Sequence, residues 1–216
     1  MALLHRSTIV PGKLELAAPW LATQPWWPGG SATALVKRGA FRLDDPDGQV
    51  GIEVMLVATA DGALLVVPLT YRDAPLVGAE AGLLGTMEHS VLGTRWTYDA
   101  AVDPVALTAL AETVRTEGAA AREMVDGPDG PAEREPSVRA RGVVRPGGAV
   151  PVVGIGAASE VVTSSDAVAT TIVVPGASFV LRRSLDAAWT PDVAPGLLAV
   201  SWGTAADVPI LAVSAV

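Results

Sequence analysis

Apolar residues gather along the first half of the chain in short segments that predict strands. Residues 34–43, 49–59 and 63–72 are rich in Val, Leu and Ile, and turn-forming residues separate them. Asp61-Gly62 joins the last two segments, and this dipeptide is typical of a two-residue hairpin. Residues 90–99 show a similar pattern after a loop. The pattern predicts a curled antiparallel sheet built from these segments.

Two further segments of this region predict helices that pack on the sheet. Asp103-Pro104 combines a residue that caps helix N-termini with a proline suited to the first turn. An apolar stripe at helical spacing follows and consists of Leu107, Leu110, Ala111 and Val114. Residues 13–18 have a shorter helical pattern, which we expect to end near Pro19 because proline disrupts a helix interior.

The second half of the chain predicts a linker followed by more strands. Residues 119–136 lack periodicity and contain a Gly-Pro-Asp-Gly-Pro run, which is typical of a flexible linker or loop. Strand patterns follow at residues 138–145, 168–174 and 178–184. The sequence therefore predicts an α+β protein with a sheet-and-helix domain at 1–118, a linker at 119–136 and a β-rich segment at 137–216.

Composition narrows the classes of function. Hydrophobic residues make up 50% of the 216 positions and charged residues only 18%, which favours a packed core over disorder. The chain has no cysteine, which excludes disulfides and thiolate chemistry, and the spacing of its two histidines, His5 and His89, does not suggest a metal site. A net charge of −8 argues against nucleic acid as a partner. We expect no cofactor.

The N-terminus and the apolar stretches favour a cytoplasmic location. The longest apolar runs are interrupted by Pro, Gly or Asp well before the roughly 20 residues that a spanning helix needs. The first residues reach Arg6 after too few apolar positions for a signal peptide. We therefore expect no membrane partner.

Two clusters of side chains are candidates for ligand binding. Trp20, Trp26 and Trp27 could form a platform for a sugar, or could close the end of a core, which is the commoner use of such residues. Residues 86–99 form the densest polar and aromatic stretch, and its candidate ligand-binding side chains are Glu88, His89, Arg95, Trp96 and Tyr98. Glu88 and His89 could serve as acid and base in a loop, whereas on a strand they would point to opposite faces.

A glycine-rich run at residues 153–159 raises the question of nucleotide binding. A dinucleotide fingerprint needs a third Gly or Ala where Ser159 stands, followed by a helix. The residues after Ser159 have an extended pattern instead. The run therefore favours a plain turn over a nucleotide site.

Several motifs of the first region resemble a known family. These are the strand Val67-Pro68-Leu69-Thr70-Tyr71-Arg72-Asp73-Ala74-Pro75-Leu76, the loop Leu84-Gly85-Thr86, and Arg95-Trp96-Thr97-Tyr98-Asp99 followed by Asp103-Pro104. They resemble the N-terminal cap domain of actinobacterial maltokinases and related aminoglycoside-phosphotransferase-like sugar kinases. The chain is especially similar to small standalone cap-domain proteins. The resemblance covers about residues 1–118 and implies a curled, cystatin-like antiparallel sheet with packed helices.

The β-rich segment resembles a truncated kinase N-lobe. Ser159-Glu160-Val161-Val162-Thr163-Ser164-Ser165 stands where these kinases carry a phosphate loop, and Phe179-Val180-Leu181-Arg182-Arg183 and then Thr190-Pro191-Asp192 follow at matching distances. On this alignment Phe179 replaces the ATP-binding lysine, and an aromatic ring cannot supply its charge. The residues up to Val216 contain no His-Gly-Asp catalytic loop and no metal-binding Asp in a suitable context. The resemblance thus implies a protein that is not an active kinase.

The sequence leaves three hypotheses of function open. The first is a non-catalytic regulatory or protein-binding accessory in trehalose, maltose or glycogen metabolism, which pairs with a protein partner or with a second copy through exposed strand edges. The second is a module that binds a sugar through the Trp cluster or the 86–99 segment. The third is an enzyme of an unrecognised type that uses Glu88, His89 and Arg95, although nothing in the sequence orients these residues together.

Overall fold

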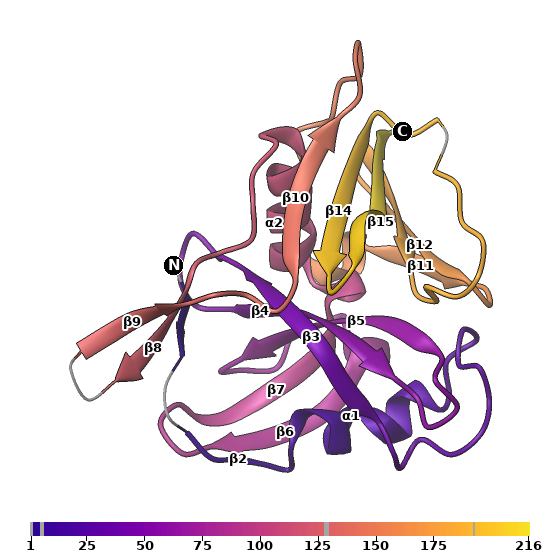
Figure 1. The fold of residues 1–216 in the computed structure, drawn as a ribbon. Helices are drawn as coiled ribbons and strands as arrows, with labels where there is room; N and C mark the ends of the chain where they lie inside the picture. Colours follow the sequence, from indigo (N-terminus) through magenta and orange to yellow (C-terminus); the bar gives the residue numbers. More distant parts are fainter. Residues whose placement is uncertain (1, 5–6, 128–129, 192) are drawn as a thin grey trace.

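The protein is β-rich, with three sheets and two α-helices among the residues described. The computed structural model describes residues 2–4, 7–127, 130–191 and 193–216 (Figure 1). The first sheet has the strand order β2-β6-β7-β5-β4-β3 and the second has the order β10-β14-β15-β13-β12-β11, and both are antiparallel throughout. A small sheet, β1-β8-β9, projects from the side of the first.

The bounds of the elements follow the chain from the first sheet to the second. The first sheet consists of β2 (Ile9–Val10), β3 (Val36–Leu43), β4 (Gly51–Ala58), β5 (Leu64–Arg72), β6 (Leu83–His89) and β7 (Gly93–Asp99). The second consists of β10 (Arg139–Val144), β11 (Val162–Ser165), β12 (Ala169–Val174), β13 (Ala177–Arg182), β14 (Gly196–Trp202) and β15 (Ala205–Ala215). The small sheet contains β1 (Ala2–Leu4), β8 (Glu123–Gly127) and β9 (Gly130–Arg134). The helices are α1 (Lys13–Leu21) and α2 (Pro104–Arg115), with 3-10 turns η1 (Glu80–Gly82), η2 (Ala100–Val102) and η3 (Ala158–Glu160).

The curled antiparallel sheet predicted for the first region is confirmed. Its three central predicted strands are β3, β4 and β5, and α2 begins at Pro104 with the Asp103 carboxylate accepting a hydrogen bond from the Val105 amide. β4 and β5 are buried on both faces, which explains why their sequences read as nearly continuous apolar runs rather than as alternating patterns.

One local prediction in this region is wrong. The segment Leu84-Gly85-Thr86, expected in a loop, lies in β6, where Gly85 has a φ of +142° next to a register shift that keeps the strand paired with β7. α1 ends near Pro19 as predicted, and continues past it to Leu21. The side chain of Leu21 is fully buried, so packing of the last turn outweighs the amide donor that proline lacks.

The second half is more extensively paired than its sequence suggests. Residues 119–136, predicted as a linker, contain the β8–β9 hairpin. The predicted strands at 138–145, 168–174 and 178–184 are present as β10, β12 and β13, whereas β11, β14 and β15 were not predicted. The glycine-rich run lies in irregular chain before the three-residue turn η3 and β11, so no long helix follows it. The likeness to a kinase N-lobe stays a prediction.

The two faces of the first sheet belong to different cores. One face packs with α2 and the second sheet in a single apolar cluster that includes Phe41, Val54, Leu110, Phe179 and Leu211. The other face carries Met55, Val57, Leu65, Val67 and Met87 and packs under α1 and Trp26. α2 comes very close to β10, because a Cβ added at Gly142 would lie 2.1 Å from the Thr113 carbonyl oxygen. Glycine is therefore required there for α2 to pack on the second sheet.

Arg183, just after β13, ties the second sheet to the first. Its side chain is only 1% exposed, and its Nη2 donates to the Asp99 carboxylate at 2.5 Å, across the boundary between the sheets. Its Nε donates to Thr170 Oγ1 at 2.8 Å, and the guanidinium lies 4.9 Å from the centre of the Trp26 ring. In the backbone, the Arg183 carbonyl accepts from the Val66 amide at 2.9 Å. One residue thus joins β7, β5, β12 and the chain after α1.

We expect Arg183→Met to lower the free energy of unfolding by about 4 kcal/mol, because it leaves the Asp99 carboxylate buried without a countercharge. Adding Asp99→Asn to this variant should restore most of the loss, since no unpaired charge is then buried. Chemical denaturation of the single and double variants measures both effects. Arg141→Met, which breaks the exposed pair with Asp207, is the control and should cost less than about 1 kcal/mol. A cost for Arg183→Met no larger than that of the control would contradict this role.

Candidate functional site

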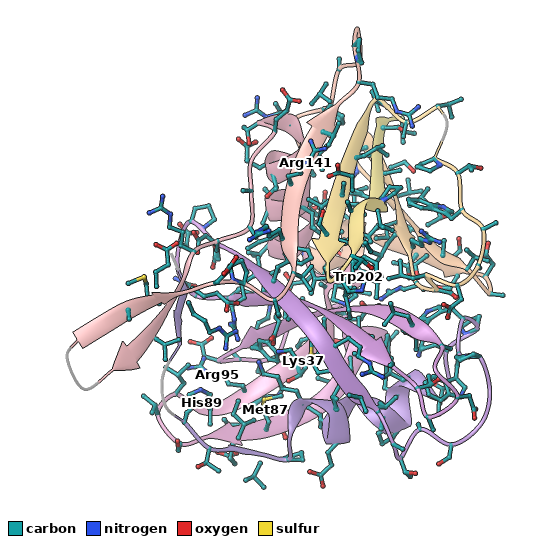
Figure 2. The ribbon with its side chains drawn as sticks, viewed as in Figure 1. Lys37, Met87, His89, Arg95, Arg141 and Trp202 are labelled. Carbon is teal, nitrogen blue, oxygen red and sulfur yellow. The ribbon has the colours of Figure 1, made fainter. Side chains whose placement is uncertain are left out.

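A cavity of about 670 Å³ opens on the α1 side of the first sheet, beside the β8–β9 hairpin. Strands β3 to β7 form its floor, the start of α1 closes one side, and Val125 and Arg134 of the hairpin close another. The charged or hydrogen-bonding side chains that line it include Lys13, Lys37, Arg42, Glu53, Tyr71, His89, Arg95 and Arg134. Figure 2 shows Lys37, His89 and Arg95 around Met87 on this side of the molecule.

Glu53 is the centre of the cavity floor. Its carboxylate accepts hydrogen bonds from Lys13 Nζ, from Lys37 Nζ at 2.8 Å and from the Tyr71 hydroxyl at 2.8 Å. A guanidinium nitrogen of Arg42 lies 3.7 Å from the same carboxylate. The Glu53 side chain is only 3% exposed, so three cations share one buried carboxylate as a countercharge.

The pairing in this network sets the protonation states of its members. Burial alone would raise the pKa of Glu53, but the charges of Lys13, Arg42 and Lys37 together hold that pKa well below its usual range. Burial, followed by the charge of Glu53 and the hydrogen bond to it, raises the pKa of Tyr71 well above its usual value. At neutral pH the floor therefore presents a fixed carboxylate and a protonated phenol.

Strand alternation explains how these residues meet. Glu53 lies on the same face of β4 as Met55 and Val57, and Arg42 is its direct partner on β3. Lys13 enters from the first turn of α1, whose preceding Gly12 amide donates to the Glu15 carboxylate at 3.2 Å. Sequence reasoning missed the network. The available signals were a lone acid within the apolar strand Gly-Ile-Glu-Val-Met-Leu-Val-Ala and the scarcity of lysine, because the chain's two lysines are Lys13 and Lys37.

Two of the predicted site residues, His89 and Arg95, line the cavity. His89 Nδ1 accepts from the backbone amides of Val91 at 3.3 Å and Leu92 at 3.1 Å, which leaves Nε2 to face the Ser7 hydroxyl at 2.9 Å. Arg95 donates from Nη2 to the Leu92 carbonyl at 2.8 Å. Its Nε is buried and has no hydrogen-bond partner among the described residues.

The other candidates from the 86–99 segment lie away from the cavity. Glu88 is exposed next to His89 on β6 and accepts from Thr94 Oγ1 at 2.7 Å. Trp96 and Tyr98 pack in a separate small cluster, where the Tyr98 hydroxyl accepts from the Leu76 amide at 2.9 Å. The structure therefore does not join Glu88 with His89 and Arg95 in one site.

The three tryptophans of the first region pack near the end of α1 and do not line the cavity. Trp26 is 2% exposed, and the Trp20 ring meets it edge-on with the ring centres 5.9 Å apart. Trp27 is half-buried and donates to the Gly30 carbonyl at 3.3 Å. Trp26 also lies against Arg183, so it takes part in joining the two sheets.

The hairpin wall is held by charge as well as by pairing. Arg134 of β9 donates from Nε and Nη2 to one oxygen of Glu123 on β8, at 3.0 and 2.5 Å. Glu123 is buried and its other oxygen lies 4.0 Å from Arg42 Nε. Arg42 therefore stands between Glu53 and Glu123 and links the hairpin to the cavity floor.

Within the described part of the chain, no group of three or more His, Asp or Glu side chains is placed to hold a metal ion. No helix in that part is long and apolar enough to span a membrane.

We expect Glu53→Gln to lower the free energy of unfolding at pH 7 by about 3 kcal/mol, because Lys13 and Lys37 lose their countercharge and Arg42 loses one of its two. The unfolded chain protonates this carboxylate near its ordinary pKa of 4.5, whereas the folded chain does so only at much lower pH. The stabilisation by Glu53 is therefore complete above about pH 5 and is lost as the pH falls towards the folded pKa. Urea denaturation of both proteins across this range should show their difference narrowing at acid pH. Glu88→Gln, at an exposed position, is the control for loss of a carboxylate, and a pH-independent difference would argue against the network.

Comparison with known protein families gives a match for most of the first sheet. Residues 20–103 match the family described as the maltokinase N-terminal cap domain. The match runs from within α1 to the residue before α2 and so contains β3 to β7. A search of curated proteins found no match. Strands β3 to β7 of the first sheet are therefore similar to the maltokinase N-terminal cap domain family.

Proposed function

We propose that this chain is a non-catalytic module that binds a sugar in the cavity on the first sheet. The observation that carries the proposal is the convergence of fixed hydrogen-bonding groups from α1, β3, β4 and β5 on one concave surface. Apolar groups of Ile9, Met87 and Leu92 complete the lining. A sugar offers both hydroxyl groups and apolar C–H faces, and a cavity of this size and mixed lining suits such a ligand.

The protonation states of the floor support a binding role rather than catalysis. A general acid or base works best with a pKa near the working pH. The pKa of Glu53 lies far below neutrality and that of Tyr71 far above it, so neither group exchanges a proton readily at pH 7. His89 uses Nδ1 to accept two backbone amides, and these hydrogen bonds orient its ring.

The setting of this role comes from the family. A maltokinase cap belongs to a sugar kinase by name, and this match supports our proposal of a role in maltose-related metabolism, with trehalose and glycogen as neighbouring pathways. Within that setting we assign the chain a regulatory function in the cytoplasm, in which binding of a sugar is the signal.

A second candidate function is that of a protein-binding accessory, and a groove of about 950 Å³ beside α2 favours it. Its floor is apolar and includes Val105, Ala109, Val153 and Ile155. Its rim carries the carboxylates of Asp44, Asp45, Asp47 and Glu112 and the guanidinium of Arg122. This pattern of charge suits a partner segment that is apolar and basic.

The first test of the sugar-binding function is calorimetric titration of the protein with maltose, trehalose and glucosamine. We expect at least one of them to bind, and Lys37→Met to weaken that binding about 10-fold, which corresponds to the loss of one hydrogen bond from a charged group. Arg141→Met is the matched control, because Arg141 is a surface cation of the second sheet, apart from Lys37 (Figure 2). Failure of all three sugars to bind, or equal binding by Lys37→Met, would count against the proposal.

The accessory function is tested by a tagged pull-down with mass spectrometry. We expect an enzyme of sugar metabolism to be captured in near-stoichiometric amount by the unaltered protein. Thr108→Arg places a cation in the acidic groove and should abolish the capture, whereas Thr204→Arg, in the exposed turn between β14 and β15, should not. Capture of the same enzyme by both variants would exclude the groove as its binding surface.

A further inference from the structure

Arg95 has no countercharge among the described residues, although it lies in a cavity that is rich in ion pairs. Its Nη2 donates to a backbone carbonyl, and its buried Nε has no partner in the described part of the chain. A guanidinium that is partly desolvated without an anion is unfavourable. Acidic residues outnumber basic ones in this chain by 23 to 15, so a shortage of carboxylates does not explain the unpaired charge.

The surroundings of Arg95 add to the excess of positive charge. The cavity lining contains five Lys or Arg side chains and three carboxylates. Of the three carboxylates, Glu53 is shared by three cations, and Asp45 accepts backbone amides of its own turn. Asp44, the third, also has a partner. Glu123, behind the lining, adds a fourth carboxylate, since it pairs with Arg134 and lies 4.0 Å from Arg42, so the described residues set four carboxylates against five cations and leave Arg95 without a direct carboxylate partner.

We propose that the ligand of this cavity carries a phosphate group, which binds at a subsite formed by Arg95, His89 and Ser7. The inference rests on the sugar-binding function proposed above and names its substrate class, a phosphorylated sugar. The Arg95 guanidinium supplies charged donors, and the Ser7 hydroxyl, which lies 2.9 Å from His89 Nε2, supplies a neutral one. A phosphate ester offers three acceptor oxygens and negative charge to a guanidinium that has no countercharge among the described residues.

The two parts of such a ligand would meet different parts of the cavity. The phosphate would lie against β6 and β7, where Arg95 and His89 stand, while the sugar hydroxyls would face the Glu53, Lys13 and Tyr71 network. Met87 is buried and is the direct strand partner of Arg95 on β6. Its side chain provides an apolar surface between the two parts of the cavity. Both the phosphate and the sugar would thus meet side chains that hydrogen bonds within the protein already hold in position.

The test compares glucose 6-phosphate, glucose and inorganic phosphate by calorimetric titration of the full chain. We expect glucose 6-phosphate to bind at least about 10-fold more tightly than glucose, and Arg95→Gln to remove this preference while leaving the affinity for glucose within about twofold. Arg95→Lys should keep part of the preference, and Arg141→Gln, a change of equal charge on the second sheet, should keep all of it. Inorganic phosphate should compete with glucose 6-phosphate on the unaltered protein, a result that needs no variant to fold.

The outcomes separate the two proposals. Equal affinity for glucose and glucose 6-phosphate would overturn the phosphate subsite and leave the sugar-binding function standing. Binding of inorganic phosphate as tight as that of the sugar phosphate, with no binding of glucose, would support the subsite and contradict the sugar-binding function. A phosphate preference lost equally in Arg95→Gln and Arg141→Gln would show general attraction of anions and would overturn the subsite.

Discussion

The ion pair between Arg183 and Asp99 is the constraint on which the arrangement of the sheets depends. Burying both charges is tolerable only if they stay together, because an isolated buried charge costs several kcal/mol. The chain after β13 must therefore lie over the end of β7, and the same arginine is held by Val66 of β5 and by Trp26 from the chain after α1. With one face of the first sheet fixed against the second sheet and α2, the α1 face is left to form the open cavity.

Glu53 is also a buried carboxylate that needs cationic partners, but its partners remain partly exposed. Arg183 and Asp99 form a nearly closed pair inside the protein, whereas Glu53 collects three cations whose side chains remain 19% to 39% exposed. The carboxylate orients these cations but cannot neutralise them all. The cations gathered around this buried carboxylate make the rim of the cavity positive, in a protein whose overall charge is −8. This local reversal of charge is what an acidic protein needs in order to attract an anionic ligand.

Local sequence patterns predicted those elements whose packing is also local. β3, β4, β5 and α2 follow from turn residues, apolar runs and a capping Asp, and they are present near their predicted bounds. β14 and β15 could not be recognised in the same way, since Asp207, with a φ of 54°, and Pro209 interrupt β15 and the pairing of the two strands includes register shifts. The site was found only in part. His89 and Arg95 are close in sequence, but Lys13, Lys37 and Glu53 come from three separate elements, and only the fold brings them together.

The family match covers only some of the residues that line the cavity. Residues 20–103 include Lys37, Glu53 and Arg95, but Lys13 and the hairpin residue Arg134 lie outside that range. Without Lys13, Glu53 would lose a direct ion-pair partner, and without the hairpin the cavity would lose the wall that Glu123 fastens to Arg42. The cap sheet therefore supplies a floor and part of the charge, while the flanking segments of this chain turn that floor into an enclosed site. A ligand that depends on both would be a property of this protein rather than of cap domains in general.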